Sequence, residues 1–306
     1  MKNNEDACSM RALRRDLHRH PELGFDEHRT AQIVAERLRE LGVEVHQGLG
    51  GTGVVGVLQR GSGVRGIGLR ADMDALAISE RNRFAHRSVN EGRMHACGHD
   101  GHTAMLLGAA ERLSRSARFE GRVHFIFQPA EEHGRGALAM MKDGLFERFD
   151  MEAVYAIHNL PALPVGRAAI AAGPVMACED NFEIRIEGRG GHAAMPHLAD
   201  DLIVTGAGIV TALQTVVSRA LNPTDRAVLS VTEFVTDGTR NALPNTVTIR
   251  GDTRAFLPGV QDQLEAAMRR IVDGICAAHG VRGSLAYSRE FAATINSEQE
   301  ARAAAR

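Results

Sequence analysis

The sequence lacks three features that would each have indicated a particular class of protein. It has 4 cysteines in 306 residues, and their wide spacing gives no disulfide framework and favours a reducing compartment. Its formal net charge is −2, so no basic surface argues for nucleic-acid binding. No segment reaches about 18 uninterrupted apolar residues, and the N-terminus does not resemble a signal peptide. We therefore expect a cytoplasmic protein that binds neither nucleic acid nor membrane.

Length and hydrophobic content predict two folded parts. A chain of 306 residues corresponds to about two domains, and a hydrophobic content of 44% is ample for packed cores. Residues 1–176 alternate short apolar strands with helical segments, which is typical of an α/β fold with a mainly parallel sheet. The strands expected in this part are 54–58, 67–70, 122–128 and 153–157.

The pattern changes near residue 177. The order of expected elements from there to residue 290 is β-α-β-β-α-β, which is that of a ferredoxin-like unit. We expect residues 177–290 to form a domain inserted into the first one, and residues 291–306 to begin the return to it. The strands expected here are 182–186, 227–235, 246–256 and 281–288, and the helices are 200–219 and 261–279.

The most informative stretch is His95–Thr103, because it contains Cys97 and His99. A thiolate and an imidazole two positions apart make half of a transition-metal site. Taken alone, the tripeptide fits a buried cysteine beside a helix-capping loop equally well, since free cysteine is often a core residue.

Other candidate ligands directly follow two of the expected strands. The pair Glu131-Glu132 comes after strand 122–128, and His158 comes after strand 153–157. Sites in open α/β sheets form at the carboxyl ends of strands, so these side chains should meet Cys97 and His99. One glutamate can bind metal while the other accepts a proton from water. Two other interpretations remain open. Glu131-Glu132 can form a solvated acidic turn, and His158 can be an ordinary hydrogen-bonded histidine.

Several further residues have two interpretations. Asp72 and Asp74 also follow an expected strand and can bind metal or orient the imidazole ligands, the second being favoured for Asp74. The glycine-rich segment Gly188–His197 suits close approach to a ligand or a plain turn. Asn241 is similarly ambiguous, and Arg254 can clamp a substrate carboxylate or lie on the surface of a strand.

Together these segments resemble the dinuclear metal-dependent amidohydrolases of the aminoacylase and carboxypeptidase G superfamily. The resemblance is strongest to the branch that holds hippurate hydrolases, N-acyl-amino-acid amidohydrolases and indole-acetyl-amino-acid hydrolases. The matching segments run in order over nearly the whole chain. They are Leu17–Leu23, Ala71–Leu76, His95–Thr103, Phe127–Glu132, Ile157–Pro161, Gly188–His197 and Asn241–Asn245.

The resemblance implies metal-dependent hydrolysis of the amide bond of small, hippurate-like N-acyl-L-amino acids. It implies two divalent metal ions, which could be zinc, manganese or cobalt. Glu131 is then the general base, His192 of the lid domain stabilises the oxyanion, and Asn241 and Arg254 hold the substrate carboxylate. The lid also implies a homodimer. The metal ligands implied are Cys97, His99, Glu132 and His158.

The chain departs from the family pattern in one respect. Members of the family supply a fifth ligand, a histidine, near their C-terminus, whereas the last histidine here is His279, inside an expected lid helix. We therefore expect a C-terminally truncated chain with weak metal binding and little activity of its own. Two alternative functions remain open, an N-acetyl-diaminopimelate deacetylase and a non-catalytic metal-binding or dimerisation remnant.

Overall fold

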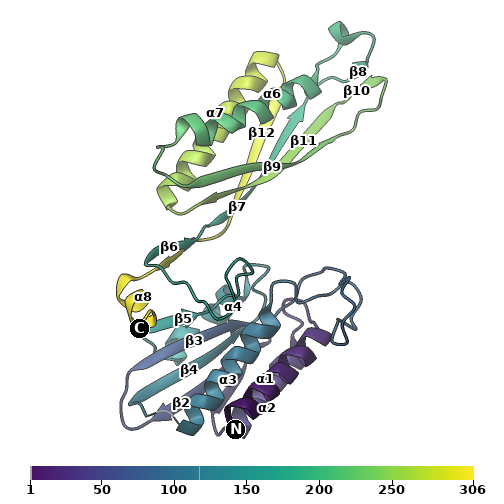
Figure 1. The fold of residues 1–306 in the computed structure, drawn as a ribbon. Coiled ribbons are helices and arrows are strands. Elements are labelled where there is room, and N and C mark those ends of the chain that lie inside the picture. Colours follow the sequence, from purple (N-terminus) through teal and green to yellow (C-terminus); the bar gives the residue numbers. More distant parts are fainter. Residues whose placement is uncertain (1, 117) are drawn as a thin grey trace. The chain divides into compact units, whose positions relative to one another are not determined.

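The chain folds into two compact units, Met1–Ala168 and Ala169–Arg306 (Figure 1). The computed structural model describes residues 2–116 and 118–306. The division lies at 168/169, whereas the sequence pattern placed it at 176/177. Residues 291–306 belong to the second unit, because β13 (Thr294–Asn296) pairs with β6 (Gly173–Met176) in an antiparallel ribbon.

The first unit contains a five-stranded mixed sheet of order β1-β2-β4-β3-β5. The pairs β1–β2 and β2–β4 are antiparallel, whereas β3–β4 and β3–β5 are parallel. The expectation of a mainly parallel sheet is therefore wrong for half of the pairings. The strands are β1 (Glu44–Leu49), β2 (Gly53–Arg60), β3 (Gly66–Asp72), β4 (Gly121–Gln128) and β5 (Ala153–Ala156).

The antiparallel half of the sheet begins with a tight turn. Gly50 and Gly51 between β1 and β2 have φ angles of 64° and 96°, a conformation that glycine adopts without steric penalty. Such a short connection can only reverse the chain, since parallel neighbours need a long crossover. The sequence analysis missed β1, and with it the hairpin.

Helices cover both faces of this sheet. Adjacent strand residues point to opposite faces, so Val54 and Phe125 enter one core and Val55 and Ile126 enter another. The first core contains residues of α1 (Lys2–Arg19), α2 (His28–Glu40) and α3 (His99–Ser116). The second contains residues of α4 (Gly136–Lys142) and α5 (Leu145–Arg148).

The three strands β3, β4 and β5 end at the same edge of the sheet. In their parallel register Asp72 lies opposite Gln128, and Arg70 lies opposite Ala156. The loops that follow these strands therefore leave from neighbouring positions, and they carry the acidic and histidine residues singled out above.

The second unit contains a four-stranded antiparallel sheet of order β12-β7-β11-β9. Along the chain, its main elements follow the order β-α-β-β-α-β. They are β7 (Glu179–Glu187), α6 (Leu202–Thr215) with a π-helical turn (Val216–Ala220), β9 (Ala227–Thr236), β11 (Thr246–Ala255), α7 (Pro258–His279) and β12 (Arg282–Phe291). Shorter elements are β8 (Gly191–His192), β10 (Ala242–Leu243), a 3₁₀ turn (Pro196–Leu198) and α8 (Glu298–Ala304).

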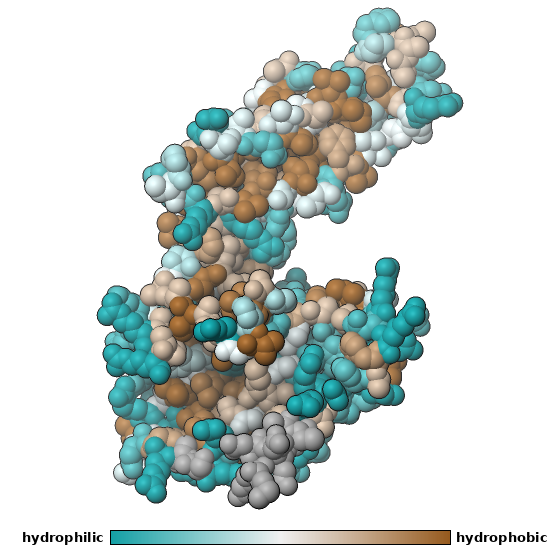
Figure 2. All heavy atoms as spheres, in the orientation of Figure 1, coloured by the Kyte–Doolittle hydropathy of each residue, from teal (hydrophilic) through white to brown (hydrophobic). Residues whose placement is uncertain are grey.

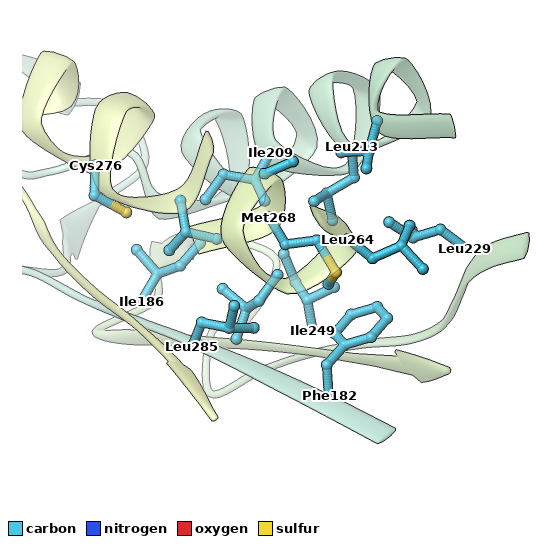
Figure 3. Close-up of a cluster of buried hydrophobic side chains, with 14 of the residues drawn as sticks. Phe182, Ile186, Ile209, Leu213, Leu229, Ile249, Leu264, Met268, Cys276 and Leu285 are labelled. Atoms are coloured by element: carbon cyan, nitrogen blue, oxygen red, sulfur yellow. The ribbon is translucent and has the colours of Figure 1, made fainter. Parts of the chain in front are cut away.

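An apolar core joins the two long helices of this unit to its sheet (Figure 3). On α7, Leu264, Met268 and Cys276 recur at helical spacing and are buried, which is the pattern of an amphipathic helix that packs one face on a core. Ile249 of β11 and Phe182 of β7 meet them from the sheet.

One helical stretch, Leu202–Ala220, is long and apolar enough by length and composition to cross a membrane. Leu202, Ile209 and Leu213 on it are fully buried in the core of the second unit, which is the packing of a core helix. Other apolar side chains on α6, such as Val204, are exposed. Figure 2 shows apolar surface over α6 and β9.

Candidate metal centre

Five side chains converge at the edge of the first sheet where β3, β4 and β5 end. Sγ of Cys97 lies 3.3 Å from Nε2 of His158, and the candidate ligand atoms of Cys97, His99 and His158 all lie within 4.8 Å of one another. The same limit holds for the ligand atoms of His99, Glu131 and Glu132. Because His99 belongs to both groups, the five side chains share one space.

A glycine allows the loop before α3 to approach the loop after β5. Gly98 has a φ angle of 90°, and a Cβ atom there would lie 2.2 Å from Oδ1 of Asn159. The side-chain amide of Asn159 also donates a hydrogen bond to the carbonyl oxygen of Cys97, at 3.1 Å. Gly98 therefore lets Cys97 reach His158 while His99 begins the helix.

The ring of His99 is oriented by Asp74. Nδ1 of His99 lies 2.9 Å from the carbonyl oxygen and 3.2 Å from Oδ1 of Asp74, so this nitrogen donates to Asp74. In the neutral ring Nε2 then carries a lone pair, and it lies 3.8 Å from carboxylate oxygens of both Glu131 and Glu132. Within the described part of the chain, buried Nε2 of His99 and Oε1 of Glu132 have no hydrogen-bond partner.

These unpartnered atoms fit a bound divalent cation. A buried imidazole nitrogen facing carboxylates, with a cysteine sulfur nearby, is a donor set that transition metals prefer. The hydrogen bond that the opposite ring nitrogen donates to Asp74 is the usual support of a ligating histidine.

The charges of the cluster support the same interpretation. Burial, together with nearby Glu132 and Glu131, raises the pKa of Cys97 to about 12. Burial also raises the pKa of Glu132. A cation bound among these groups would reverse both shifts, because it favours the thiolate and the carboxylate. For His99, burial opposes the charged form, but Asp74 and Asp72 outweigh it and raise the pKa to about 8.

Asp72 forms a second support through a histidine that the sequence analysis did not assign to the site. Oδ1 of Asp72 lies 2.6 Å from Nδ1 of His102, and Nε2 of His102 lies 2.9 Å from the backbone nitrogen of Asn159. These two hydrogen bonds connect the end of β3 to the loop that carries His158. The position of His102, three residues after His99 on α3, was the available signal.

The electrostatics of Asp72 differ from those of the glutamates. Burial raises its pKa, but the His102 hydrogen bond and the Arg70 guanidinium, 2.8 Å away, outweigh burial and hold the pKa well below its usual range. Asp72 is therefore ionised. Its second oxygen lies 3.6 Å from Nε2 of His99, so both sequence-predicted aspartates contact imidazoles of the cluster.

The turn that carries the two glutamates is held at both ends. Oδ2 of Asp74 accepts a hydrogen bond from the backbone N–H of Glu132 at 3.0 Å. On the other side, Oε1 of Glu27 accepts one from the backbone N–H of Ala130 at 2.7 Å. Glu27 is fully buried, and nothing in the sequence pattern had marked it.

His192 and Asn241 lie together in the second unit. The strands β8 and β10 pair so that His192 is opposite Ala242, and the N–H of Ala193 donates to the carbonyl of Asn241 at 3.0 Å. Nδ1 of His192 accepts a hydrogen bond from the N–H of Ala194 at 3.1 Å.

Arg254 is separated from this pair. Its Nη2 and Nε atoms lie 2.6 Å from Glu179 and 2.7 Å from Asp252. Asn241 precedes the first residue of β11, Thr246, whereas Arg254 lies near the last, and eight residues of strand span roughly 27 Å. The expectation that Asn241 and Arg254 hold the same carboxylate therefore cannot apply within one chain.

Comparison with known proteins identifies relatives over nearly the whole chain. The chain is 41% identical over 287 residues to the hippurate hydrolase of Campylobacter jejuni, which covers 94% of this chain and 75% of the relative. It is 43% identical over 293 residues to an N-acyl-L-amino acid amidohydrolase of Geobacillus stearothermophilus, covering 94% and 78%.

A solved structure supports the same grouping. The Bacillus subtilis YXEP protein, described as a dinuclear metal-binding peptidase of the M20 family, superposes with a TM-score of 0.84 at 32% identity and covers 99% of this chain and 79% of its own. The model of peptidase family M20/M25/M40 matches residues 68–305. On the strength of this match and of the relatives, the chain belongs to peptidase family M20/M25/M40.

Proposed function

We propose that this hydrolase cleaves the amide bond of N-acyl-L-amino acids, with hippurate-like compounds as substrates. The observation that carries the proposal is the pair of buried, unpartnered atoms, Nε2 of His99 and Oε1 of Glu132, beside the cysteine and the second histidine. Relatives that are more than 40% identical bear the names of enzymes acting on such compounds.

Four residues would hold divalent metal in this scheme, namely Cys97, His99, Glu132 and His158. When bound, metal would supply Lewis-acid polarisation of the amide carbonyl and a lowered pKa for water. We propose two ions, and zinc, manganese and cobalt are all compatible with the mixed sulfur, nitrogen and oxygen donors.

Glu131 is the proposed general base. Its side chain is 37% exposed, whereas that of Glu132 is 22% exposed, so Glu131 is better placed to meet water and substrate. It takes a proton from the attacking water as the oxygen bonds to the amide carbon. When the carbon–nitrogen bond breaks, Glu131 returns the proton to the leaving nitrogen, and the products are a carboxylate and an amino acid.

The second unit is the proposed lid and dimerisation domain, of ferredoxin-like topology. In this proposal His192 stabilises the oxyanion, and Asn241 and Arg254 bind the substrate carboxylate. Because these two are far apart within one chain, a two-fold pair of chains would supply them to one site from different copies. The edge strand β9 and the exposed apolar residues of α6 support such pairing.

The test of this function is hydrolysis of N-benzoylglycine by the purified protein after loading with zinc, manganese or cobalt in separate reactions. Because the sequence predicts little activity for this chain, we expect slow release of glycine, and none from a sample stripped of metal by a chelator. Benzamide, which lacks the substrate carboxylate, is the matched poor substrate. A protein that binds metal yet cleaves no member of a panel of N-acyl amino acids would instead support a non-catalytic remnant.

A further inference from the structure

A segment near the N-terminus contacts the turn that carries Glu131 and Glu132. Both carboxylate oxygens of Glu27 are engaged, Oε1 by the N–H of Ala130 at 2.7 Å and Oε2 by the hydroxyl of Thr52 at 2.5 Å. The side chain is fully buried, and 103 residues separate it from Ala130. A buried carboxylate is unfavourable unless it is hydrogen-bonded, so this contact is specific.

The residue that Glu27 contacts has an unfavourable backbone conformation. Ala130 has a φ angle of 45°, and only one other non-glycine residue, Phe25, has a positive φ within the described ranges. The left-handed region is disfavoured for residues with a Cβ atom. Such a conformation persists only where the surrounding structure holds it in place, and here it directly precedes Glu131.

The packing around the turn leaves no room for it to shift. A Cβ atom on Gly24 would lie 2.6 Å from Nδ1 of His133 and 3.0 Å from the Cα of Ala130. A Cβ atom on Gly136 would lie 1.6 Å from the carbonyl oxygen of Pro129. The N-terminal segment therefore contacts the turn at Ala130 and His133, and the first residue of α4 contacts it at Pro129.

We propose that Glu27 is a positioning residue, whose carboxylate holds Ala130 in the left-handed conformation and thereby directs Glu131 and Glu132 into the metal centre. Asp74 holds the turn from the opposite side, through the N–H of Glu132. The catalytic meaning of this contact rests on the proposed function, whereas its effect on metal binding depends only on Glu132 being a ligand.

The test combines substitutions at the two ends of the contact. Glu27→Ala removes both acceptors, and Glu27→Gln keeps the shape of the side chain but loses one acceptor. Ala130→Gly makes the left-handed conformation accessible without help. Glu22→Gln is the matched control, because Glu22 lies in the same segment but accepts from the backbone N–H groups of Arg29 and Thr30.

The first measurement is titration with cobalt ions alone, which requires no substrate. Loss of an outer partner of a metal ligand typically costs about 10–100-fold in affinity, and we expect Glu27→Ala to lie in that range and Glu27→Gln to show a smaller loss. When Ala130→Gly is also present, the loss should shrink to about threefold or less, since glycine needs less external support. Glu22→Gln should lower the thermal midpoint while leaving cobalt affinity unchanged.

The second measurement is the kinetics of N-benzoylglycine hydrolysis. Glu27→Ala should lower kcat by a similar factor while KM changes little, because the misdirected group acts on the reacting atoms. Equal losses of cobalt affinity with and without the Ala130→Gly substitution would overturn the proposal, as would full affinity in a folded Glu27→Ala protein. If Glu27→Ala fails to fold, Glu27→Gln provides the same comparison. A wild-type protein that binds cobalt but hydrolyses nothing would refute the proposed function and leave the cobalt test of Glu27 intact.

Discussion

The two units differ in how fully their buried polar side chains are hydrogen-bonded. In the described part of the chain, every buried side-chain polar atom without a hydrogen-bond partner lies in the first unit, including atoms of His95, His99 and Glu132. In the second unit the fully buried carboxylate of Asp180 is satisfied by Gln261 and Tyr287. Unsatisfied buried polar atoms are costly, so their concentration in one unit indicates where function has been favoured over stability.

We expect the largest effect from a substitution that changes the chemistry of the first unit without disturbing its packing. Glu131→Gln should lower turnover of N-benzoylglycine by about 10²–10⁴-fold, because an amide cannot accept the proton of water. Metal content should stay at the wild-type level, since Glu131 is not a proposed ligand. The check is steady-state kinetics together with metal analysis. Activity within a few-fold of wild type would remove Glu131 from its role as base.

The second prediction breaks the apolar core of the second unit. Ile249→Ala should lower the free energy of unfolding by about 2–5 kcal/mol, because Ile249 is fully buried and its removal leaves a cavity. Metal affinity of the first unit should not change, as the proposed ligands all belong to that unit. Chemical denaturation and cobalt titration measure the two properties separately. A parallel loss of both would show that the units are coupled.

The third prediction compares two cysteines, one from each unit. Removing a residue that hydrogen-bonds to a metal ligand typically lowers metal affinity about 10–100-fold. Cys97→Ala removes a proposed ligand itself, so it should lower metal affinity by at least that factor. Cys276→Ala is the control, because Cys276 lies in the core of the second unit and should affect stability without affecting metal. Metal analysis after dialysis distinguishes them. Equal metal content in the two variants would indicate that Cys97 is a core residue and not a metal ligand.

The smallest expected effect concerns a buried histidine beside the site. The hydrogen bond to Asp100 raises the pKa of His18 above its ordinary value. The stability it contributes is complete below the unfolded pKa of about 6.5 and is lost as the pH rises through the higher folded value. The stability difference between wild type and His18→Gln should therefore be larger at about pH 6 than at about pH 8.5, by roughly 1 kcal/mol.

The control for that prediction has the opposite sign. Burial lowers the pKa of His124, so its neutral form is favoured and its contribution is lost as the pH falls. Denaturation of His124→Gln over the same pH range should give the opposite slope. Parallel slopes for the two variants would contradict the assignment of either histidine.

The features that depend on local periodicity could be predicted from the sequence. The apolar stripe of α7, the strands β2 to β5 and the positions of Cys97, Glu132 and His158 just beyond or between them all follow from residue spacing. Since parallel strands end at one edge, spacing was enough to predict that these residues meet. The family motifs added the expected roles.

The tertiary structure alone decided the contacts between distant segments. The antiparallel pairing of β2 with β4, the link from Asp72 through His102 to Asn159, and the ion pair between Arg254 and Glu179 have no local periodicity to reveal them. The contact between Glu27 and Ala130 is the extreme case, since it joins a helix terminus to a turn 103 residues away. The sequence does not reveal this contact, because Glu27 and Ala130 come together only when the whole unit has folded. The contact then satisfies the buried carboxylate of Glu27 and supports the strained backbone of Ala130.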